Sequence, residues 1–333
     1  MSARIVLVTG GAGFIGSNLV ARLAEDPGRD VVVCDWLGDA DEARWRNIAK
    51  HPVADVVFPE QMFDWLGRRW HDLEAVVHMG AISSTTEPDV DKVIRNNFLL
   101  PRDLFRFCAE NRRRLIYASS AATYGDGALG FDDDNDPAAL AALRPLNAYG
   151  WSKALFDQFV VREAARDLAP PQWAGLKFFN VYGPNEGHKG TMKSVAAQIW
   201  PDVLAGRPVR LFKSYHPDYP DGGQLRDFVY VRDAADVVEW LVSRPDVSGI
   251  FNLGSGRARS FKDLAEGVFA AAGVVPRIEY IDMPEALQGR YQYHTEARLE
   301  RLRAAGYEGQ FTGLEDGVAD YVKGYLSQPD PYR

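Results

Sequence analysis

Short apolar runs alternate with longer amphipathic stretches along the first half of the chain. The runs are rich in β-branched residues and predict strands at 4–8, 31–35, 75–78, 114–119 and 175–179. The amphipathic stretches predict helices at about 13–23, 90–111 and 148–166. Alternating strands and helices are joined by right-handed crossovers, and strands with two apolar faces are covered on both sides. The pattern therefore predicts an α/β fold with a doubly wound parallel sheet.

The second half has a less regular pattern. Glycine, proline and aromatic residues become frequent from 181 to 227, which is typical of a substrate-binding region of loops and short helices. Later segments look like returns to the first domain: 227–231 followed by 234–243, and 249–253. The tail predicts helices at 261–272 and 295–305 and a strand at 277–280. We expect a first domain of 1–180 plus about 227–256, and a smaller mixed α/β substrate domain of about 181–226 plus 257–333.

Composition narrows the class of protein. The 333 residues carry 38 Lys and Arg against 46 Asp and Glu, a formal net charge of −8, so we expect no nucleic-acid-binding surface. The two cysteines, Cys34 and Cys108, lie in apolar settings, which favours a reducing cytoplasm over a disulfide framework. Glycines interrupt the apolar stretch after residues 1–3, so we expect neither a signal peptide nor a membrane span. The six histidines have no paired ligand spacing, which predicts no metal site.

A glycine-rich loop follows the first predicted strand. Gly10, Gly13 and Gly16 form Gly-x-x-Gly-x-x-Gly before a predicted helix, and Asp35 follows at the end of the second strand. Such a loop lets the backbone approach a pyrophosphate, and the acidic residue is placed to bind the adenosine ribose. The pattern predicts a Rossmann-type dinucleotide site, with a plain tight turn as the alternative.

The choice of dinucleotide stays open. Asp35 favours NAD, since a 2′-phosphate would meet a carboxylate. Arg44 and Arg46 follow it and could pair with that phosphate, which would favour NADP. The two arginines could equally lie on a solvated helix face.

Tyr149 and Lys153 stand four residues apart, hence on one face of a predicted helix. A tyrosine titrates near a pKa of about 10, and a nearby lysine charge would lower that pKa and could also hold the nicotinamide ribose. Ser120, just beyond an apolar strand, could bond the reacting oxygen. The alternative is a solvated helix face with no catalytic role.

These motifs, in this order, resemble the extended short-chain dehydrogenase/reductases. Further segments resemble one group among them, the ADP-L-glycero-D-manno-heptose 6-epimerases. They are 80–87, 118–125, 226–231, 289–292 and, most specifically, 179–190, which ends in Gly187-His188-Lys189-Gly190. The resemblance covers nearly the whole chain.

The resemblance implies oxidation of C6 of the heptose by a bound nicotinamide, turnover of a planar 6-keto intermediate, and return of hydride to its other face. Inversion of this kind uses two acid/base groups, which would be Tyr149 and Lys189. Lys189 could otherwise bind phosphate or face solvent. The resemblance also implies NADP as the cofactor, provision of heptose for the lipopolysaccharide core, and a homo-oligomer, which is a pentamer in this family.

The resemblance also implies the contacts of each ligand. The cofactor would touch Gly10, Gly11, Gly13, Phe14, Ile15, Gly16, Asp35, Trp36, Met79, Gly80, Ala81, Ile82, Ser83, Asn96, Lys153, Val181 and Lys189. The substrate would touch Ser120, Asn180, Thr191, Gln198, Phe212, Lys213, Ser214, Tyr215, Arg226 and Tyr291. Arg226 would clamp a diphosphate, with a structural Arg226–Asp227 pair and a merely buried Tyr291 as alternatives.

Some positions depart from the family pattern. Thr191 replaces a serine, Gln198 replaces a histidine, the loop 212–223 is longer, and Glu42 lies about where a phosphate-binding lysine is expected. These departures loosen the inference to ADP and NADP, so NAD stays possible.

Three other functions are compatible with parts of this pattern. A UDP-hexose 4-epimerase would use Tyr149 alone as its base. A 4,6-dehydratase would need an Asp-Glu pair where Ala121 and Ala122 stand. A non-catalytic dinucleotide sensor would not need the intact Ser120, Tyr149 and Lys153.

Overall fold

The computed structural model describes residues 4–39, 43–288 and 291–333. Among the positions discussed above, residues 1–3, Glu42, Gly289 and Arg290 lie outside these ranges.

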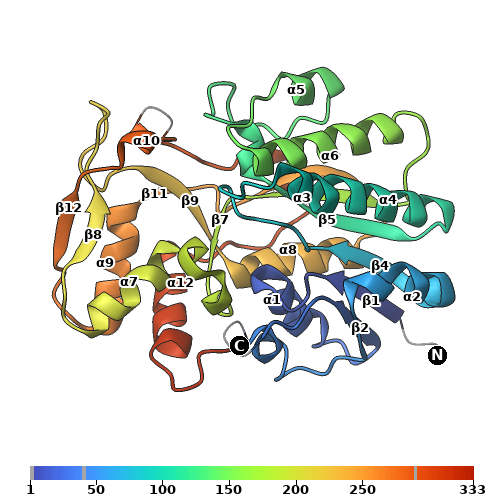
Figure 1. Cartoon of the computed structure of the whole chain (residues 1–333), viewed down its shortest axis with the longest axis horizontal. Helices are drawn as coiled ribbons and strands as arrows, with labels where there is room; N and C mark the ends of the chain where they lie inside the picture. The colour runs from blue at the N-terminus through green and yellow to red at the C-terminus, as the bar shows by residue number, and fades with distance from the viewer. Residues whose placement is uncertain (1–3, 40–42, 289–290) are drawn as a thin grey trace.

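A seven-stranded parallel sheet forms the larger part of the molecule (Figure 1). Its order is β10-β6-β5-β4-β1-β2-β3. The strands are β1 Arg4–Thr9, β2 Arg29–Cys34, β3 Asp55–Val57, β4 Leu73–His78, β5 Arg114–Ser120, β6 Trp173–Phe178 and β10 Gly249–Leu253. The prediction of a doubly wound α/β sheet is confirmed. The edge strand β3 was not predicted, because three residues are too few to show a period.

Helices cover both faces of this sheet. Figure 1 shows α4 and α6 on one side and α1 and α8 on the other. The helices are α1 Phe14–Leu23, α2 Met62–Arg69, α3 Val90–Ile94, α4 Leu100–Glu110, α5 Pro137–Ala142, α6 Ala148–Ala164 and α8 Val231–Ser243. Val6 and Val8 of β1 pack toward α1 and α8, whereas Ile5 and Leu7 pack toward α2, α4 and α6. Because both faces are buried, the strand reads as one apolar run.

Two smaller sheets and a second core lie at the left of Figure 1. One sheet has the order β11-β9-β7 and the other pairs β12 with β8. The strands are β7 Asn180–Tyr182, β8 Val209–Phe212, β9 Leu225–Tyr230, β11 Ala258–Ser260 and β12 Ile278–Ile281. The helices are α7 Val195–Leu204, α9 Phe261–Ala272, α10 Glu285–Gln288, α11 Glu300–Ala304 and α12 Leu314–Tyr321. Thus β10 belongs to the large sheet and α8 covers one of its faces, while β9 lies in the three-stranded sheet.

One long predicted helix contains an irregular turn. The segment predicted at 90–111 consists of α3, a π-helical turn at Arg95–Leu99, and α4. Pro101 lacks the amide that a regular helix would use there, and a π turn accommodates the missing bond. The helix predicted at 295–305 is shorter than expected and covers only α11. No helix in the described residues is long and apolar enough to cross a membrane.

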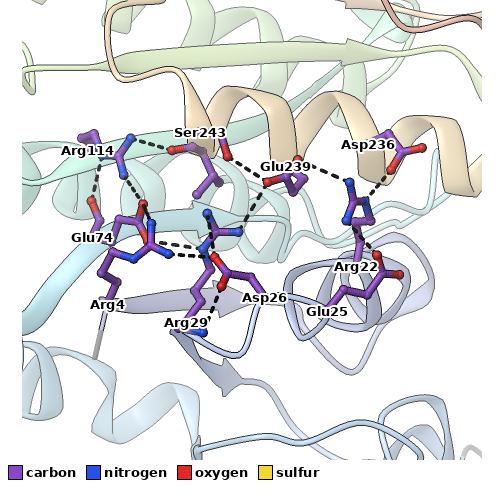
Figure 2. Close-up of polar contacts among 12 residues, drawn as sticks. Arg4, Arg22, Glu25, Asp26, Arg29, Glu74, Arg114, Asp236, Glu239 and Ser243 are labelled. Carbon is purple, nitrogen blue, oxygen red and sulfur yellow. Dashed lines mark hydrogen bonds and ion pairs between the residues drawn. The ribbon is translucent and has the colours of Figure 1, made fainter. Parts of the chain in front are cut away.

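Charged side chains gather at the amino ends of the large sheet (Figure 2). Glu74 of β4 accepts from Arg114 at 2.9 Å and from Arg29 at 3.3 Å. Arg29, almost fully buried, also approaches Glu239 of α8 at 3.5 Å. Figure 2 shows the guanidinium groups of Arg4, Arg29 and Arg114 around Glu74. This network joins the four neighbouring strands β5, β4, β1 and β2 to α8 at the edge opposite the carboxyl ends.

Candidate active site

A cavity of about 620 Å³ opens at the carboxyl ends of β1, β2, β4 and β5. Parallel α/β sheets bind their ligands at this edge. Its wall contains most of the predicted cofactor contacts and three predicted catalytic residues: Gly10, Gly13, Phe14, Ile15, Gly16, Asp35, Trp36, Met79, Gly80, Ala81, Ile82, Ser83, Asn96, Tyr149, Lys153 and Lys189. The structure therefore brings the glycine loop, the Tyr–Lys pair and Lys189 to one cavity.

The glycine loop has the shape that a dinucleotide requires. Gly10 adopts φ +66°, and a Cβ there would lie 2.6 Å from the backbone of Gly80. A Cβ on Gly16 would collide with the carbonyl oxygen of Gly10, so α1 could not begin so close to β1. Gly11 packs against the backbone of β1 rather than lining the cavity. In the described chain no side chain caps the first amides of α1 after Gly13, which leaves them available to a pyrophosphate.

Asp35 closes one end of the cavity. Its buried carboxylate accepts from the amides of Ala12 at 3.0 Å and Trp36 at 2.8 Å, and it lies 3.5 Å from Arg44. Burial raises the pKa of Asp35, while Arg44 and the amides oppose that rise. Arg44 lines the cavity, whereas Arg46 stacks on Trp45 and Tyr332. Of the two arginines predicted as possible phosphate partners, only Arg44 therefore lies at the cavity.

The loop at 79–83 is held by Asn97, which sequence reasoning missed. Its side chain bonds both the amide and the carbonyl of Ile82 at 2.9 Å and reaches Ser152 of α6 at 3.1 Å. The predicted residue, Asn96, lines the cavity and bonds back to Lys92. The π turn displaces the helical register at this dipeptide, so spacing alone could not tell which asparagine faces the loop.

Tyr149 stands beside Ser120 because α6 begins close to β5. Asn147 caps α6 by accepting from the Gly150 amide at 2.8 Å. A Cβ on Gly150 would lie 2.6 Å from the carbonyl oxygen of Ala122, so only glycine permits this approach. A side-chain hydrogen bond joins Tyr149 to Ser120 and lowers the Tyr149 pKa, but burial has the larger effect and raises it.

Lys153 lies one turn further along α6. Its Nζ donates to the carbonyl of Ala118 at 2.8 Å, and burial lowers its pKa to about 8. The sequence led us to expect that Lys153 would lower the pKa of Tyr149. The structure differs, since burial determines the direction of that pKa and the lysine is bonded to the backbone.

Lys189 reaches the same cavity from the turn Gly187–Met192. Its Nζ lies 5.0 Å from the centre of the Phe14 ring. Burial lowers the pKa of Lys189, and the carboxylate of Glu186 opposes that effect. A lysine with a lowered pKa can exchange a proton near neutral pH, which a solvated lysine cannot do efficiently.

Glu186 ties the two ends of the turn that carries Lys189. Its buried carboxylate accepts from the amide and the hydroxyl of Ser194, both at 2.5 Å, and from Tyr321 of α12 at 3.0 Å. Gly190, at φ 54°, breaks the turn between these anchors. The role of Glu186 was not predicted from the sequence, because its partner Tyr321 lies 135 residues away.

Arg226 and Tyr291 meet outside the cavity wall. The Arg226 guanidinium lies 5.1 Å from the centre of the Tyr291 ring and 5.5 Å from that of Phe261. Burial lowers the Arg226 pKa. The alternative of an Arg226–Asp227 pair is wrong, because Asp227 instead accepts from Ser255, Gly256 and Ala297.

The remaining predicted contacts, those of the substrate and the cofactor contact Val181, lie in three places. Asn180 and Val181 form the start of β7. The exposed Gln198 amide donates to the carbonyl of Thr191 at 3.2 Å. After Phe212, Lys213 and Tyr215 both bond Asp282, and the Ser214 amide donates to Asp221. These residues and Ser120 are not in the wall of the cavity as described above.

Further cavity residues went unpredicted, among them Thr9, His78, His188 and Met192. Thr9 Oγ1 and His78 Nδ1 lie 2.7 Å apart and link β1 to β4. Within 4–39, 43–288 and 291–333, no group of three or more His, Cys, Asp or Glu side chains could hold a metal ion.

Known proteins are similar to this chain over nearly its whole length. Residues 6–254 match the model of the NAD dependent epimerase/dehydratase family. The chain is 49% identical over 328 residues to an ADP-L-glycero-D-manno-heptose-6-epimerase of Nitratidesulfovibrio vulgaris, covering 98% of this chain and 99% of the relative. It is 45% identical to the protein of that name in Fusobacterium nucleatum, covering 98% and 100%.

Solved structures extend the likeness to three dimensions. The crystal structure of an ADP-L-glycero-D-manno-heptose-6-epimerase from Helicobacter pylori superposes with a TM-score of 0.80 at 28% identity, covering 98% of this chain and 97% of that one. A UDP-glucose 4-epimerase of Thermus thermophilus, in complex with NAD, superposes with a TM-score of 0.72 at 26% identity, covering 96% and 98%. The chain therefore belongs to the NAD dependent epimerase/dehydratase family and, within it, to the ADP-L-glycero-D-manno-heptose 6-epimerases.

Proposed function

We propose that this isomerase inverts C6 of ADP-D-glycero-D-manno-heptose to give ADP-L-glycero-D-manno-heptose through a transient 6-keto intermediate. The observation that carries the proposal is that Tyr149 and Lys189, from separate elements, line the same cavity as the glycine loop. Inversion at a carbon requires proton handling in two orientations, and these side chains supply two acid/base groups. A UDP-hexose 4-epimerase would use Tyr149 alone as its base, so it would give Lys189 no catalytic role.

Tyr149 takes the proton of the C6 hydroxyl in one orientation, and Ser120 bonds the same oxygen. The hydrogen bond between the two side chains supports these roles, since it stabilises the phenolate that burial alone disfavours. A nicotinamide dinucleotide, held by the glycine loop, Asp35 and Lys153, supplies the hydride acceptor and donor. Lys153 contributes its charge beside the nicotinamide ribose.

Lys189 moves the proton when the intermediate presents its other face. Burial supports a base, since it lowers the Lys189 pKa, whereas the Phe14 ring and the Glu186 carboxylate favour the ammonium form. The ties from Glu186 to Ser194 keep the amine at the cavity wall. Lys189 would therefore be a base rather than a phosphate contact.

Arg226 supports a nucleotide sugar as the substrate. Its guanidinium lies over the rings of Phe261 and Tyr291, and Nη1 donates to the Leu225 carbonyl at 2.8 Å, so its other nitrogens would bind phosphate oxygens. The segment Phe212–Tyr215 would lie on the nucleotide side of this clamp, as the family pattern implies. ADP is the nucleotide of the full-length relatives, so we propose ADP for this chain.

We propose NADP as the cofactor. Arg44 lies beside Asp35 at the cavity and could neutralise a 2′-phosphate that the carboxylate alone would repel. It would thus replace the lysine that the family pattern places after the second strand.

The test is to incubate the protein with ADP-D-glycero-D-manno-heptose and to follow the C6 configuration by proton NMR. Wild type should form the L-glycero epimer, and Lys189→Ala and Tyr149→Phe should each lose that conversion. Lys193→Ala is the matched control, because it removes a lysine from the same segment that does not line the cavity. If wild type leaves the heptose unchanged and turns over a UDP-hexose, the proposal is wrong.

The resemblance further supports a homo-oligomer in the cytoplasm that supplies heptose for the lipopolysaccharide core. Sedimentation of the purified protein tests the assembly, and cell fractionation tests the location. A monomer, or a protein recovered outside the cytoplasm, would contradict these proposals.

A further inference from the structure

A buried ion pair lies next to the proposed catalytic residues. Asp157 of α6 and Lys177 of β6 are both fully buried, and Lys177 Nζ lies 3.0 Å from Asp157 Oδ2. Burying two charges is unfavourable unless they pair and their remaining hydrogen-bonding groups are satisfied. Neither residue lines the cavity, and the proposed function assigns neither a role.

The pair joins the three elements that hold the site together. Asp157 stands four residues after Lys153 on α6, and it accepts from Ser119 Oγ at 2.7 Å and from Tyr117 OH at 3.1 Å, both on β5. Lys177, on β6, donates to Thr123 Oγ1 at 2.6 Å. Ser119 and Thr123 flank Ser120 on either side.

The pair also places charge close to the proposed acid/base groups. The Asp157 carboxylate raises the pKa of both Tyr149 and Lys153. Lys177, at 3.0 Å, opposes that field with a charge of the other sign. The carboxylate raises the phenol pKa with Lys177 in place, and loss of Lys177 would leave its charge unopposed.

Other titratable groups face the pair or Lys153 and stay the same in the experiment below. Tyr117 and Tyr124 border the pair, and the Lys177 ammonium lies 4.7 Å from the centre of the Tyr124 ring. Asp133 faces Lys177 from the loop before α5. His78 of β4 faces Lys153, and its burial lowers its pKa to about 3, so it is neutral throughout.

We propose that Asp157 and Lys177 act as a positioning pair: they join the elements that carry the proposed catalytic residues, and Lys177 opposes the charge of Asp157 beside the Tyr149 phenol. The inference rests on the proposed role of Tyr149. It goes beyond that role by assigning a function to two residues that touch neither ligand.

The experiment titrates Tyr149 directly in protein loaded with NADP. The tyrosinate absorbance is followed against pH for wild type, Asp157→Asn, Lys177→Met and the double variant. Each is measured with and without Tyr149→Phe, so that the difference reports Tyr149 alone. Glu74→Gln, which removes a carboxylate from the buried network at the other edge of the sheet, controls for loss of stability.

Lys177→Met leaves a negative charge near the phenol, so the Tyr149 midpoint should rise by about one pH unit. Asp157→Asn leaves a positive charge, so the midpoint should fall by a similar amount. The double variant should have a midpoint between those of the single variants, and Glu74→Gln should not move the wild-type midpoint. Midpoints that stay in place, or that move in the same direction in both single variants, overturn the proposal.

If the Lys177→Met variant does not fold, the Asp157→Asn variant alone tests the proposal. A lowered midpoint supports the proposal and an unmoved one overturns it. The measurement needs no sugar, so it is separable from the test of the substrate. If the two single variants shift the midpoint in opposite directions but the protein does not epimerise ADP-heptose, the role of the ion pair is supported and the proposed substrate is wrong.

Discussion

At the scale of single residues, the proposed second base depends on a side chain that is far away in sequence. Lys189 sits in a short turn whose ends are held through Glu186, and one of the three donors to that carboxylate is Tyr321. A carboxylate that loses a donor in a buried setting holds its remaining partners less firmly. The position of the lysine is therefore coupled to α12.

We expect Tyr321→Phe to lower kcat for epimerisation by roughly tenfold, which corresponds to about 1.5 kcal/mol for one hydrogen bond to a charged group. Cofactor affinity should not change, because the glycine loop is untouched. Steady-state kinetics and NADP titration check both. Tyr325→Phe, a second buried tyrosine four residues later, is the control, and equal losses in the two variants would contradict the coupling.

Arg44 allows a test of cofactor choice. Arg44→Ala should weaken NADP binding by roughly tenfold to a hundredfold, since it removes a charged partner of a phosphate. NAD binding should change little, so the preference should move toward NAD. Equilibrium titration of both dinucleotides measures this, with Arg46→Ala as the control. An equal loss for both dinucleotides would show that Arg44 acts only on Asp35.

Much of the site could be predicted from local motifs, because the glycine loop, Tyr149 and Lys153 keep their spacing within single loop–helix units. The contacts that hold the surrounding loops in place could not be predicted. Asn97 depends on a π turn, and Glu186 depends on partners from another helix. The pKa of Tyr149 also required the structure, because burial is a property of the whole fold.

At the scale of elements, the approach of α6 to β5 brings the phenol and the serine together. Gly150 permits this approach, and Asn147 fixes where α6 begins. The sequence predicted α6 well, with 148–166 expected and Ala148–Ala164 found, although a helix buried on several sides shows little apolar period. It predicted neither α2 nor β3: three residues are too few to show a period, and the amphipathic pattern of the eight-residue α2 was missed.

Gly150→Ala should separate the start of α6 from Ala122 and move Tyr149 away from Ser120. We expect the epimerase rate to fall by at least about tenfold, because a small displacement of a reacting group is costly, while the protein remains folded. Kinetics together with circular dichroism test this. Gly267→Ala is the control, because a Cβ there meets only ordinary contacts of 3.5 Å or more. An active Gly150→Ala variant would contradict the close approach.

At the scale of the whole molecule, catalytic and stabilising charges occupy opposite edges of the large sheet. Glu74 serves three strands at the amino edge, so its loss would leave Arg29 and Arg114 poorly paired. Glu74→Gln should lower the free energy of unfolding by about 3 kcal/mol, with little effect on kcat. Urea denaturation measures this. Asp246→Asn, which breaks an exposed pair with Arg244, should change it far less.

The path of the chain between the sheets has a consequence for how such enzymes diversify. The chain leaves the large sheet at Phe178 and starts β7 at Asn180, with only Phe179 between them. It returns for β10 and then leaves again for β11 and β12. The strands of the smaller sheets thus come from two separate stretches of the gene. Recombination of one contiguous segment would divide them, so we expect new substrate ranges in this architecture to arise mainly by point changes and by insertions into loops.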